Sequence, residues 1–209
     1  MRTRIKVCGI TREVDARAAA HAGSDAIGLV FYPRSRRLVS VEQARRISAV
    51  TPPFVDVVAL FLDADADEVR TVLDAVPVDV LQFHGRESAS FCEAFGRRYL
   101  KVLAMGEGAP PPAEQVSAHP RATGFLLDSH GLGQAGGTGA AFDWGRFPRD
   151  VDAPLILAGG LAPGNVAEAV RRTRPWAVDV SSGVESAPGI KDSRRIETFI
   201  REVERVRDH

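Results

Sequence analysis

Residues 153–185 read APLILAGGLAPGNVAEAVRRTRPWAVDVSSGVE, and this stretch decides the fold class. Apolar and β-branched residues fill 153–158 and 176–181, which predicts two short strands. The charged segment Asn165–Arg172 between them has helical spacing, and each strand runs into a glycine-rich turn. A strand, a helix and a second strand within about 30 residues are typical of a parallel βαβ unit.

The same alternation continues towards both ends of the chain. Further candidate strands lie at 4–8, 25–31, 55–62, 78–82, 99–104 and 123–128. Segments with helical spacing lie at Glu42–Val50, Asp67–Ala75, Glu87–Phe95 and Ser193–Val206. Eight strands in 209 residues leave about 26 residues per unit, which is the lower end of what a (β/α)8 barrel needs. We therefore predict an α/β fold, a single-domain (β/α)8 TIM barrel that spans residues 1–209.

Two helices of this barrel are poorly marked in the sequence. Pro110–Pro112 interrupts the segment after the fifth strand, and the glycine-rich stretch Gly131–Gly139 replaces the expected start of a helix after the sixth. Helix boundaries near 106–120 and 131–150 are accordingly left open. Both stretches are short and lie inside the repeating pattern, so neither is expected to be a linker between domains.

Composition limits the classes of partner. The chain has 27 Lys and Arg against 27 Asp and Glu, a net charge of zero, with 44% hydrophobic and 26% charged residues. These figures are typical of a folded globular protein and provide no electrostatic footprint for nucleic acid or an anionic membrane. No run of about 18 apolar residues predicts a membrane span, and the first residues do not resemble a signal peptide, so a cytoplasmic protein is expected.

Cysteine and histidine usage predicts neither a disulfide framework nor a zinc site. Cys8 and Cys92 are the two cysteines, and there is no Cys-x-x-Cys motif and no paired histidine spacing. Cys8 and Cys92 therefore either pack in the core or take part in a reaction.

Polar residues recur on one face of several strands, close to the strand ends. Side chains alternate faces, so Lys6 and Cys8 share one face of the first strand, and Asp128 ends the sixth. The same alternation groups Gln82 with His84 and Asp179 with Ser181. In a barrel these side chains would point into the mouth at the carboxyl ends of the strands, where barrel enzymes hold their sites. A single polar residue at such a place can equally be the start of a loop.

Cys8 and Asp128 are candidates for acid–base chemistry. The alternative for Cys8 is a small buried hydrophobe, and for Asp128 a turn or cap residue. A thiolate base requires a depressed pKa, for which Lys6 on the same face would supply the positive charge. A carboxyl across the mouth from such a thiolate would complete an acid and base pair suited to sugar isomerisation.

Glycines and arginines point to anion binding. Three glycine-rich stretches are present, Gly136–Gly139, Ala158–Leu161 and Ser181–Glu185. The last two follow strands seven and eight, where barrels of this kind hold phosphate, and neither matches a nucleotide-binding motif. Arg34, Arg36 and Arg37 follow the second strand, either as a solvated face or with one guanidinium pairing a substrate carboxylate. The residues alone do not decide which arginine that would be.

At these positions the chain resembles the phosphoribosylanthranilate isomerase family, the (β/α)8 enzymes of the third step of the tryptophan branch. The likeness runs from Lys6 to the C-terminal helix. Its motifs, in chain order, are Lys6–Thr11, Gly28–Phe31 with Ser35-Arg36, Gln82–Gly85, Leu127–Ser129, Gly136–Gly139 with Phe142–Trp144, Leu157–Leu161 with Pro163 and Asn165, and Asp179–Glu185 with Gly189, Lys191 and Asp192.

The resemblance implies an Amadori rearrangement of N-(5-phospho-β-D-ribosyl)anthranilate to 1-(2-carboxyphenylamino)-1-deoxy-D-ribulose 5-phosphate, without a metal or other cofactor. Asp128 would be the general acid that protonates the ribose ring oxygen, and Cys8 the general base that takes the proton from C2. The same resemblance implies substrate-binding roles for Arg36 (on the anthranilate carboxylate), Gln82, His84, Asp179, Gly160, Ser181, Ser182 and Gly183 (around the phosphate), and Gly137 and Gly139 (in a stretch that closes over it).

Two other functions are considered beside this one. The first is the histidine-pathway isomerase, which performs the same rearrangement on a larger bis-phosphorylated substrate and pairs two aspartates where this chain has Cys8 and Asp128. The second is a barrel without catalysis that binds a sugar phosphate, which predicts that Cys8 is dispensable. The expected partner is a small phosphorylated molecule, and the expected assembly is a monomer or a homodimer.

Overall fold

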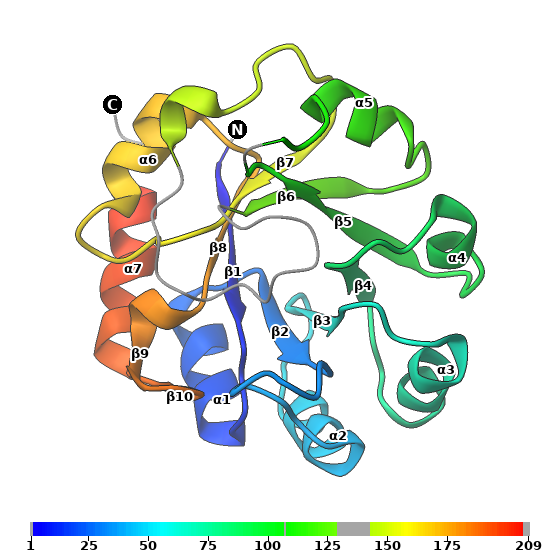
Figure 1. Cartoon of the computed structure of the whole chain (residues 1–209). Coiled ribbons are helices and arrows are strands. Elements are labelled where there is room, and N and C mark those ends of the chain that lie inside the picture. Colours follow the sequence, from blue (N-terminus) through cyan, green and yellow to red (C-terminus); the bar gives the residue numbers. More distant parts are fainter. Residues whose placement is uncertain (1, 107, 129–142, 207–209) are drawn as a thin grey trace.

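Eight parallel strands close into a barrel in which each strand pairs with its neighbours in chain order, and β8 returns to pair with β1 (Figure 1). The structure is a computed structural model and describes residues 2–106, 108–128 and 143–206. The barrel strands are β1 (Arg4–Cys8), β2 (Ala26–Val30), β3 (Asp56–Phe61), β4 (Val80–Phe83), β5 (Arg98–Ala104), β6 (Gly124–Asp128), β7 (Leu155–Leu157) and β8 (Ala177–Val180). The eight predicted strands and the (β/α)8 barrel are thus confirmed.

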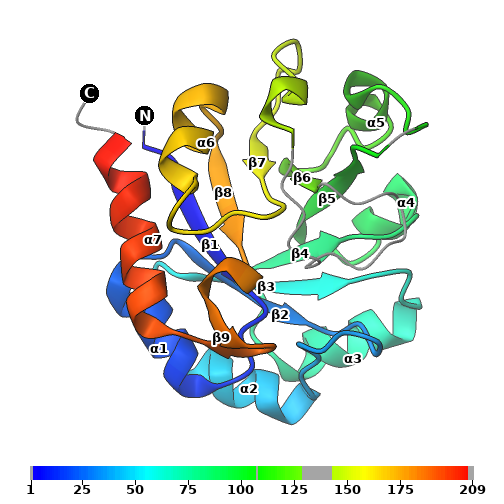
Figure 2. The ribbon, with the colours of Figure 1, turned by 60° about the vertical axis from the view of Figure 1, so that its left-hand side comes forward.

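Helices cover the outside of the barrel (Figures 1 and 2). They are α1 (Glu13–Ala22), α2 (Val41–Ala49), α3 (Ala66–Ala75), α4 (Ala89–Glu93), α5 (Pro112–Ser117), α6 (Val166–Thr173) and α7 (Ser193–Arg205). Four of the five predicted helices agree with these bounds within one residue at each end. The helix predicted over Glu87–Phe95 is shorter, because Ser88 caps it by accepting the amide of Phe91 and Gly96, with φ +61°, follows its end.

The helix α1 was not predicted, and the bounds of α5 were left open by the sequence. α1 starts at Glu13 without a side-chain cap and ends at Gly23, whose φ of +102° a residue with a Cβ would adopt only under strain. α5 begins at Pro112, the last of the three prolines, in the first turn, where the missing amide hydrogen is not needed. Between β6 and β7 the described residues hold only the 3-10 turn η1 (Trp144–Arg146). The predicted loop at Gly131–Gly139 lies outside the described residues.

The barrel strands bury two different surfaces. Their outward face packs against the helices in a large apolar layer that includes Phe61, Phe83, Tyr99 and Phe199. Part of the barrel interior is also apolar, with Val102, Leu126, Ile156, Ala158 and Ala177 packed together. Towards the carboxyl ends the interior becomes polar, because Lys6, Gln82, His84, Asp128 and Asp179 are buried there. The apolar part of the interior therefore stabilises the barrel, and the carboxyl ends of the strands supply the polar side chains of a site.

A small second sheet follows β8. The turn η2 (Ser182–Val184) leads into β9 (Glu185–Ala187), which pairs antiparallel with β10 (Ile190–Lys191) before α7 begins. This hairpin was not predicted, because its strands are only three and two residues long. It places the side chains of Glu185 and Lys191 beside β1 and the mouth of the barrel.

No helix among the residues that the structure describes combines the length and the apolar character needed to cross a bilayer.

Candidate active site

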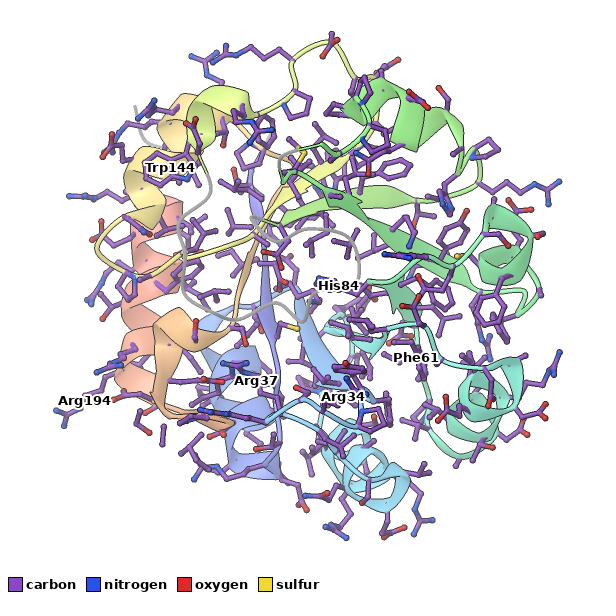
Figure 3. The ribbon with its side chains drawn as sticks, viewed as in Figure 1. Arg34, Arg37, Phe61, His84, Trp144 and Arg194 are labelled. Atoms are coloured by element: carbon purple, nitrogen blue, oxygen red, sulfur yellow. The ribbon has the colours of Figure 1, made fainter. Side chains whose placement is uncertain are left out.

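A cavity with about 90 Å³ of space for water-sized molecules lies at the carboxyl ends of the barrel strands and opens to solvent. Its polar lining consists of Cys8, Ser35, Arg37, Gln82, His84, Asp128, Asp179 and Ser181, and its apolar lining includes Val30, Tyr32, Leu60, Leu62 and Leu126. Polar strand-end residues separated by up to 173 positions in the chain thus meet in one place. In Figure 3, His84 lies near the middle of the ring of strands, whereas Arg194 lies outside α7 at the edge of the molecule.

Cys8 lies at the end of β1 beside a buried ion pair, which is formed by Lys6 and Asp179. Lys6 Nζ donates to Asp179 Oδ1 at 2.9 Å, and both side chains are more than 90% buried. Gly28 on β2 makes this possible, because a Cβ there would lie 2.8 Å from Cys8 Sγ and 3.2 Å from Lys6 Nζ. Although burial opposes the charge of Lys6, Asp179 and Cys8 raise the pKa of its ammonium, which stays protonated.

Lys6 acts on the pKa of the Cys8 thiol in the direction that its charge predicts, but the net pKa is raised and not depressed. Burial raises the pKa of the Cys8 thiol above its ordinary value of 9.0, and the charge of Asp179 adds to that increase. Lys6 and Lys191 oppose it without reversing it. The reason is that Cys8 ends a strand inside a closed barrel, where desolvation of the thiolate outweighs one nearby cation that is itself neutralised by Asp179.

Asp128 lies at the end of β6 beside His84. Nε2 of His84 is 3.6 Å from Oδ2 of Asp128, and fewer than one tenth of either side chain is exposed. Burial lowers the pKa of His84, and Lys101 lowers it further, while the charge of Asp128 opposes the change. The imidazole of His84 is therefore neutral at neutral pH and lies next to the carboxyl group of Asp128.

Gln82 points into the same space from β4. Its Oε1 is buried, and no described residue donates a hydrogen bond to it. An orphaned acceptor in a cavity is an appropriate partner for a hydroxyl or amine of a ligand.

Arg37, and not Arg36, lines the cavity. Arg36 is exposed to solvent, whereas the side chain of Arg37 is 13% exposed and forms a bidentate pair with Glu185, Nε to Oε1 at 2.7 Å and Nη2 to Oε2 at 2.8 Å. Gly9 lets Arg37 cross β1, because a Cβ there would lie 2.3 Å from Arg37 Cδ. The role that the resemblance implied for Arg36 therefore fits Arg37, since adjacent residues of this loop point in different directions.

The two glycine turns after β7 and β8 touch one another. Gly159 and Gly160 have φ of +81° and +64°, and Asn165 braces their turn by donating to Gly160 O and accepting the amide of Ala162. A Cβ on Gly183 would lie 1.9 Å from the carbonyl oxygen of Leu161, so only glycine permits this approach. Gly160, Ser182 and Gly183 are consequently brought together beside Ser181, which lines the cavity. Gly137 and Gly139 lie outside the described residues.

Two charged residues of the site, Glu185 and Lys191, were not singled out as functional from the sequence. Lys191 donates from Nζ to Ser181 O at 3.1 Å and to Glu185 Oε1 at 2.9 Å, and Glu185 holds Arg37. Glu185 and Lys191 belong to motifs that support the resemblance, but only the hairpin β9–β10 shows which side chains they contact. Among the described residues, no group of three His, Cys, Asp or Glu side chains is arranged to hold a metal ion.

Comparison with known proteins gives a consistent result. The family model described as N-(5'phosphoribosyl)anthranilate (PRA) isomerase matches residues 5–202. The chain is 54% identical over 202 residues to N-(5'-phosphoribosyl)anthranilate isomerase of Pseudomonas fluorescens, which covers 97% of this chain and 96% of that protein.

Solved structures agree as well. Phosphoribosyl anthranilate isomerase from Thermus thermophilus superposes with a TM-score of 0.86 at 35% identity, over 97% of this chain and 99% of that one. A second phosphoribosyl anthranilate isomerase, solved in complex with reduced 1-(o-carboxyphenylamino)-1-deoxyribulose 5-phosphate, has a TM-score of 0.79 at 36% identity, over 97% and 98% of the two chains.

Proposed function

Because the chain belongs to the N-(5'-phosphoribosyl)anthranilate isomerase family, we infer that it converts N-(5'-phosphoribosyl)anthranilate into 1-(2-carboxyphenylamino)-1-deoxyribulose 5-phosphate in tryptophan biosynthesis. It is an isomerase that interconverts an aldose and a ketose. The observation that supports this function at the site is that Cys8, Asp128 and Arg37 line the same cavity. A phosphorylated small molecule is the substrate.

Asp128 and Cys8 would divide the proton transfers between them. The Asp128 carboxyl gives a proton to the ribose ring oxygen, and the ring opens to a Schiff base with the anthranilate nitrogen. The Cys8 thiolate then takes the proton from C2, which produces an enolamine that tautomerises to the ketone. His84 supports this assignment, because a neutral imidazole beside Asp128 can share a hydrogen bond with the acid without adding a second positive charge.

The rest of the cavity fits the parts of the substrate. Leu60, Leu62 and Tyr32 provide an apolar wall for the anthranilate ring, and Arg37 at the same side suits its carboxylate. Gln82 and Asp179 would contact the ribose hydroxyls from the barrel interior. The turns at Gly160 and Ser181–Gly183 would hold the phosphate through backbone amides. The closing of Gly137 and Gly139 over it stays a prediction that the resemblance implies.

Other properties remain proposals that follow from the sequence. We propose one domain over residues 1–209, a cytoplasmic enzyme, a reaction without cofactor, and a monomer or homodimer. None of these is needed for the assignment of the acid and the base.

A steady-state assay tests the function. Freshly generated phosphoribosylanthranilate is supplied, and loss of its anthranilate fluorescence is followed for wild type, Cys8→Ser and Asp128→Asn. We expect turnover in wild type and a loss of about 10²-fold or more in each variant, because a hydroxyl is a poor base and an amide cannot donate the proton. Full activity in either variant would remove that residue from the mechanism. An inactive wild type that binds the substrate would favour the histidine-pathway substrate, to be tried next, or a barrel without catalysis.

A further inference from the structure

One buried carboxylate, that of Glu185, holds two cations of the site. It pairs both oxygens with Arg37, and its Oε1 also accepts from Lys191 Nζ at 2.9 Å. Only 6% of the Glu185 side chain is exposed, and none of the Lys191 side chain. Although burial opposes ionisation, the hydrogen bonds from Arg37 and Lys191 lower the pKa of Glu185, so the carboxylate is charged at neutral pH.

The pairing determines which edge of the Arg37 guanidinium is left for a ligand. Glu185 occupies Nε and one hydrogen of Nη2. A ligand carboxylate can therefore bind bidentately through the opposite edge, formed by Nη1 and the second hydrogen of Nη2. A guanidinium held at one edge is already oriented for the other, which reduces the entropy lost when the ligand binds.

The same carboxylate connects the two ends of the site. Through Lys191 it reaches the carbonyl oxygen of Ser181, at the turn after β8, and through Arg37 it reaches the loop after β2. The main chain of the hairpin is fixed in turn, because Gly189 donates to Glu185 Oε1 and Arg195 donates to the Glu185 carbonyl oxygen. Two cations beside one carboxylate also leave one positive charge to attract an anionic substrate.

We propose that Glu185 is a positioning residue that orients Arg37 for the substrate's aromatic carboxylate and so determines selectivity for carboxylated substrates. This inference rests on the proposed function, which supplies the carboxylate. Glu185 acts through Arg37 and touches no reacting atom. The structure contains a suitable control in Asp25, a carboxylate that pairs with Arg2 and accepts the amide of Ile5 at the opposite end of the barrel.

The test compares two probes on wild type, Glu185→Gln and Asp25→Asn. The first probe is reduced 1-(o-carboxyphenylamino)-1-deoxyribulose 5-phosphate, and the second is the same molecule without its carboxyl group. Calorimetric Kd values for Glu185→Gln should rise about tenfold for the carboxylated probe and less than about twofold for the other. Asp25→Asn should leave both Kd values as in wild type. In an Arg37→Ala background, Glu185→Gln should no longer change the Kd of either probe, which a purely structural role does not predict.

Each result decides the proposal. Equal losses for both probes, or no loss for the carboxylated one, would overturn it. If thermal melting shows that Glu185→Gln is unfolded, Glu185→Asp takes its place, because it keeps the charge and withdraws the carboxylate by one methylene. Failure of the proposed function is recognised separately, since wild type would then neither isomerise phosphoribosylanthranilate nor prefer the carboxylated probe.

Discussion

At the scale of single residues, the central feature is a thiol whose surroundings disfavour its own ionisation. Cys8 is 6% exposed and shares its barrel layer with Val30 and Leu60. Lys6 and Lys191 attract the thiolate, while burial and Asp179 repel it, and the balance raises the pKa of Cys8 above 9.0. In the ligand-free enzyme most of the proposed base is therefore protonated at neutral pH.

The pH dependence of alkylation should show this directly. In a Cys92→Ala background, the rate at which iodoacetamide modifies Cys8 should rise about tenfold per pH unit up to pH 9 and level off only above it. Mass spectrometry of the modified peptide measures the rate. A plateau below pH 9 would mean that the cations outweigh burial.

The sequence and the structure assign the substrate carboxylate to different arginines, Arg36 and Arg37. Arg37→Ala should raise KM for phosphoribosylanthranilate about tenfold or more, because it removes a charge-assisted pair with the substrate carboxylate. Arg36→Ala should leave kcat and KM close to wild type, because its side chain is in solvent. Steady-state kinetics of both variants decide between the two residues, and the reverse ranking would restore Arg36.

At the scale of elements, a buried ion pair joins β5 to the loop after β4, and its carboxylate also holds the loop after β3. Lys101 of β5 donates to Glu87 Oε2 at 2.8 Å and to Gly85 O at 2.6 Å, and about 5% or less of either side chain is exposed. Glu87 also accepts the amides of Asp63 and Gly85. Gly85 directly follows His84, so this pair fixes the loop that presents His84 to the cavity.

Replacing Lys101 alone should destabilise the fold far more than replacing Lys101 and Glu87 together with uncharged residues. We expect Lys101→Met to lower the free energy of unfolding by about 3–5 kcal/mol, because the Glu87 carboxylate would be buried without a partner. Lys101→Met with Glu87→Gln should recover part of that loss, since the amide oxygen still accepts from the backbone. Urea denaturation measures both.

A surface pair provides the control for this comparison. The Arg45–Glu42 pair on α2 is more than half exposed, so Arg45→Met should leave the urea midpoint almost unchanged. Equal destabilisation by the Lys101 and Arg45 substitutions would contradict the argument from burial.

At the scale of the whole molecule, closing the barrel concentrates titratable groups in a space with little water, and its stability then depends on pH. Burial lowers the pKa of His84 and of His119 below 6.5 in the folded state. Between the folded pKa and 6.5 the unfolded chain binds more protons, so stability increases with pH across that window and falls as pH drops through it.

Urea midpoints measured from pH 7.5 to 5.5 should therefore decline in wild type and decline less in His84→Gln and in His119→Gln. Glu185 does not interfere, because its lowered pKa matters only below 4.5. Parallel curves for the three proteins would show that these histidines titrate as they do in the unfolded chain.

The alternation of strand and helix, and the face on which Cys8, Gln82 and Asp179 lie, were predictable from the sequence. Both depend on local periodicity, 2.0 residues in a strand and 3.6 in a helix, which the chain carries without reference to distant contacts. The acid and base candidates, Asp128 and Cys8, followed from the same pattern and from a resemblance in the surrounding motifs.

The tertiary structure alone decided that Arg37 enters the site, that the pKa of Cys8 is raised, and that Glu185 joins the two halves of the pocket. These properties depend on partners far away in the chain, 148 residues between Arg37 and Glu185 and 173 between Lys6 and Asp179. Burial and the field of neighbouring charges exist only once the barrel has closed, because desolvation is a property of the assembled interior and not of any segment.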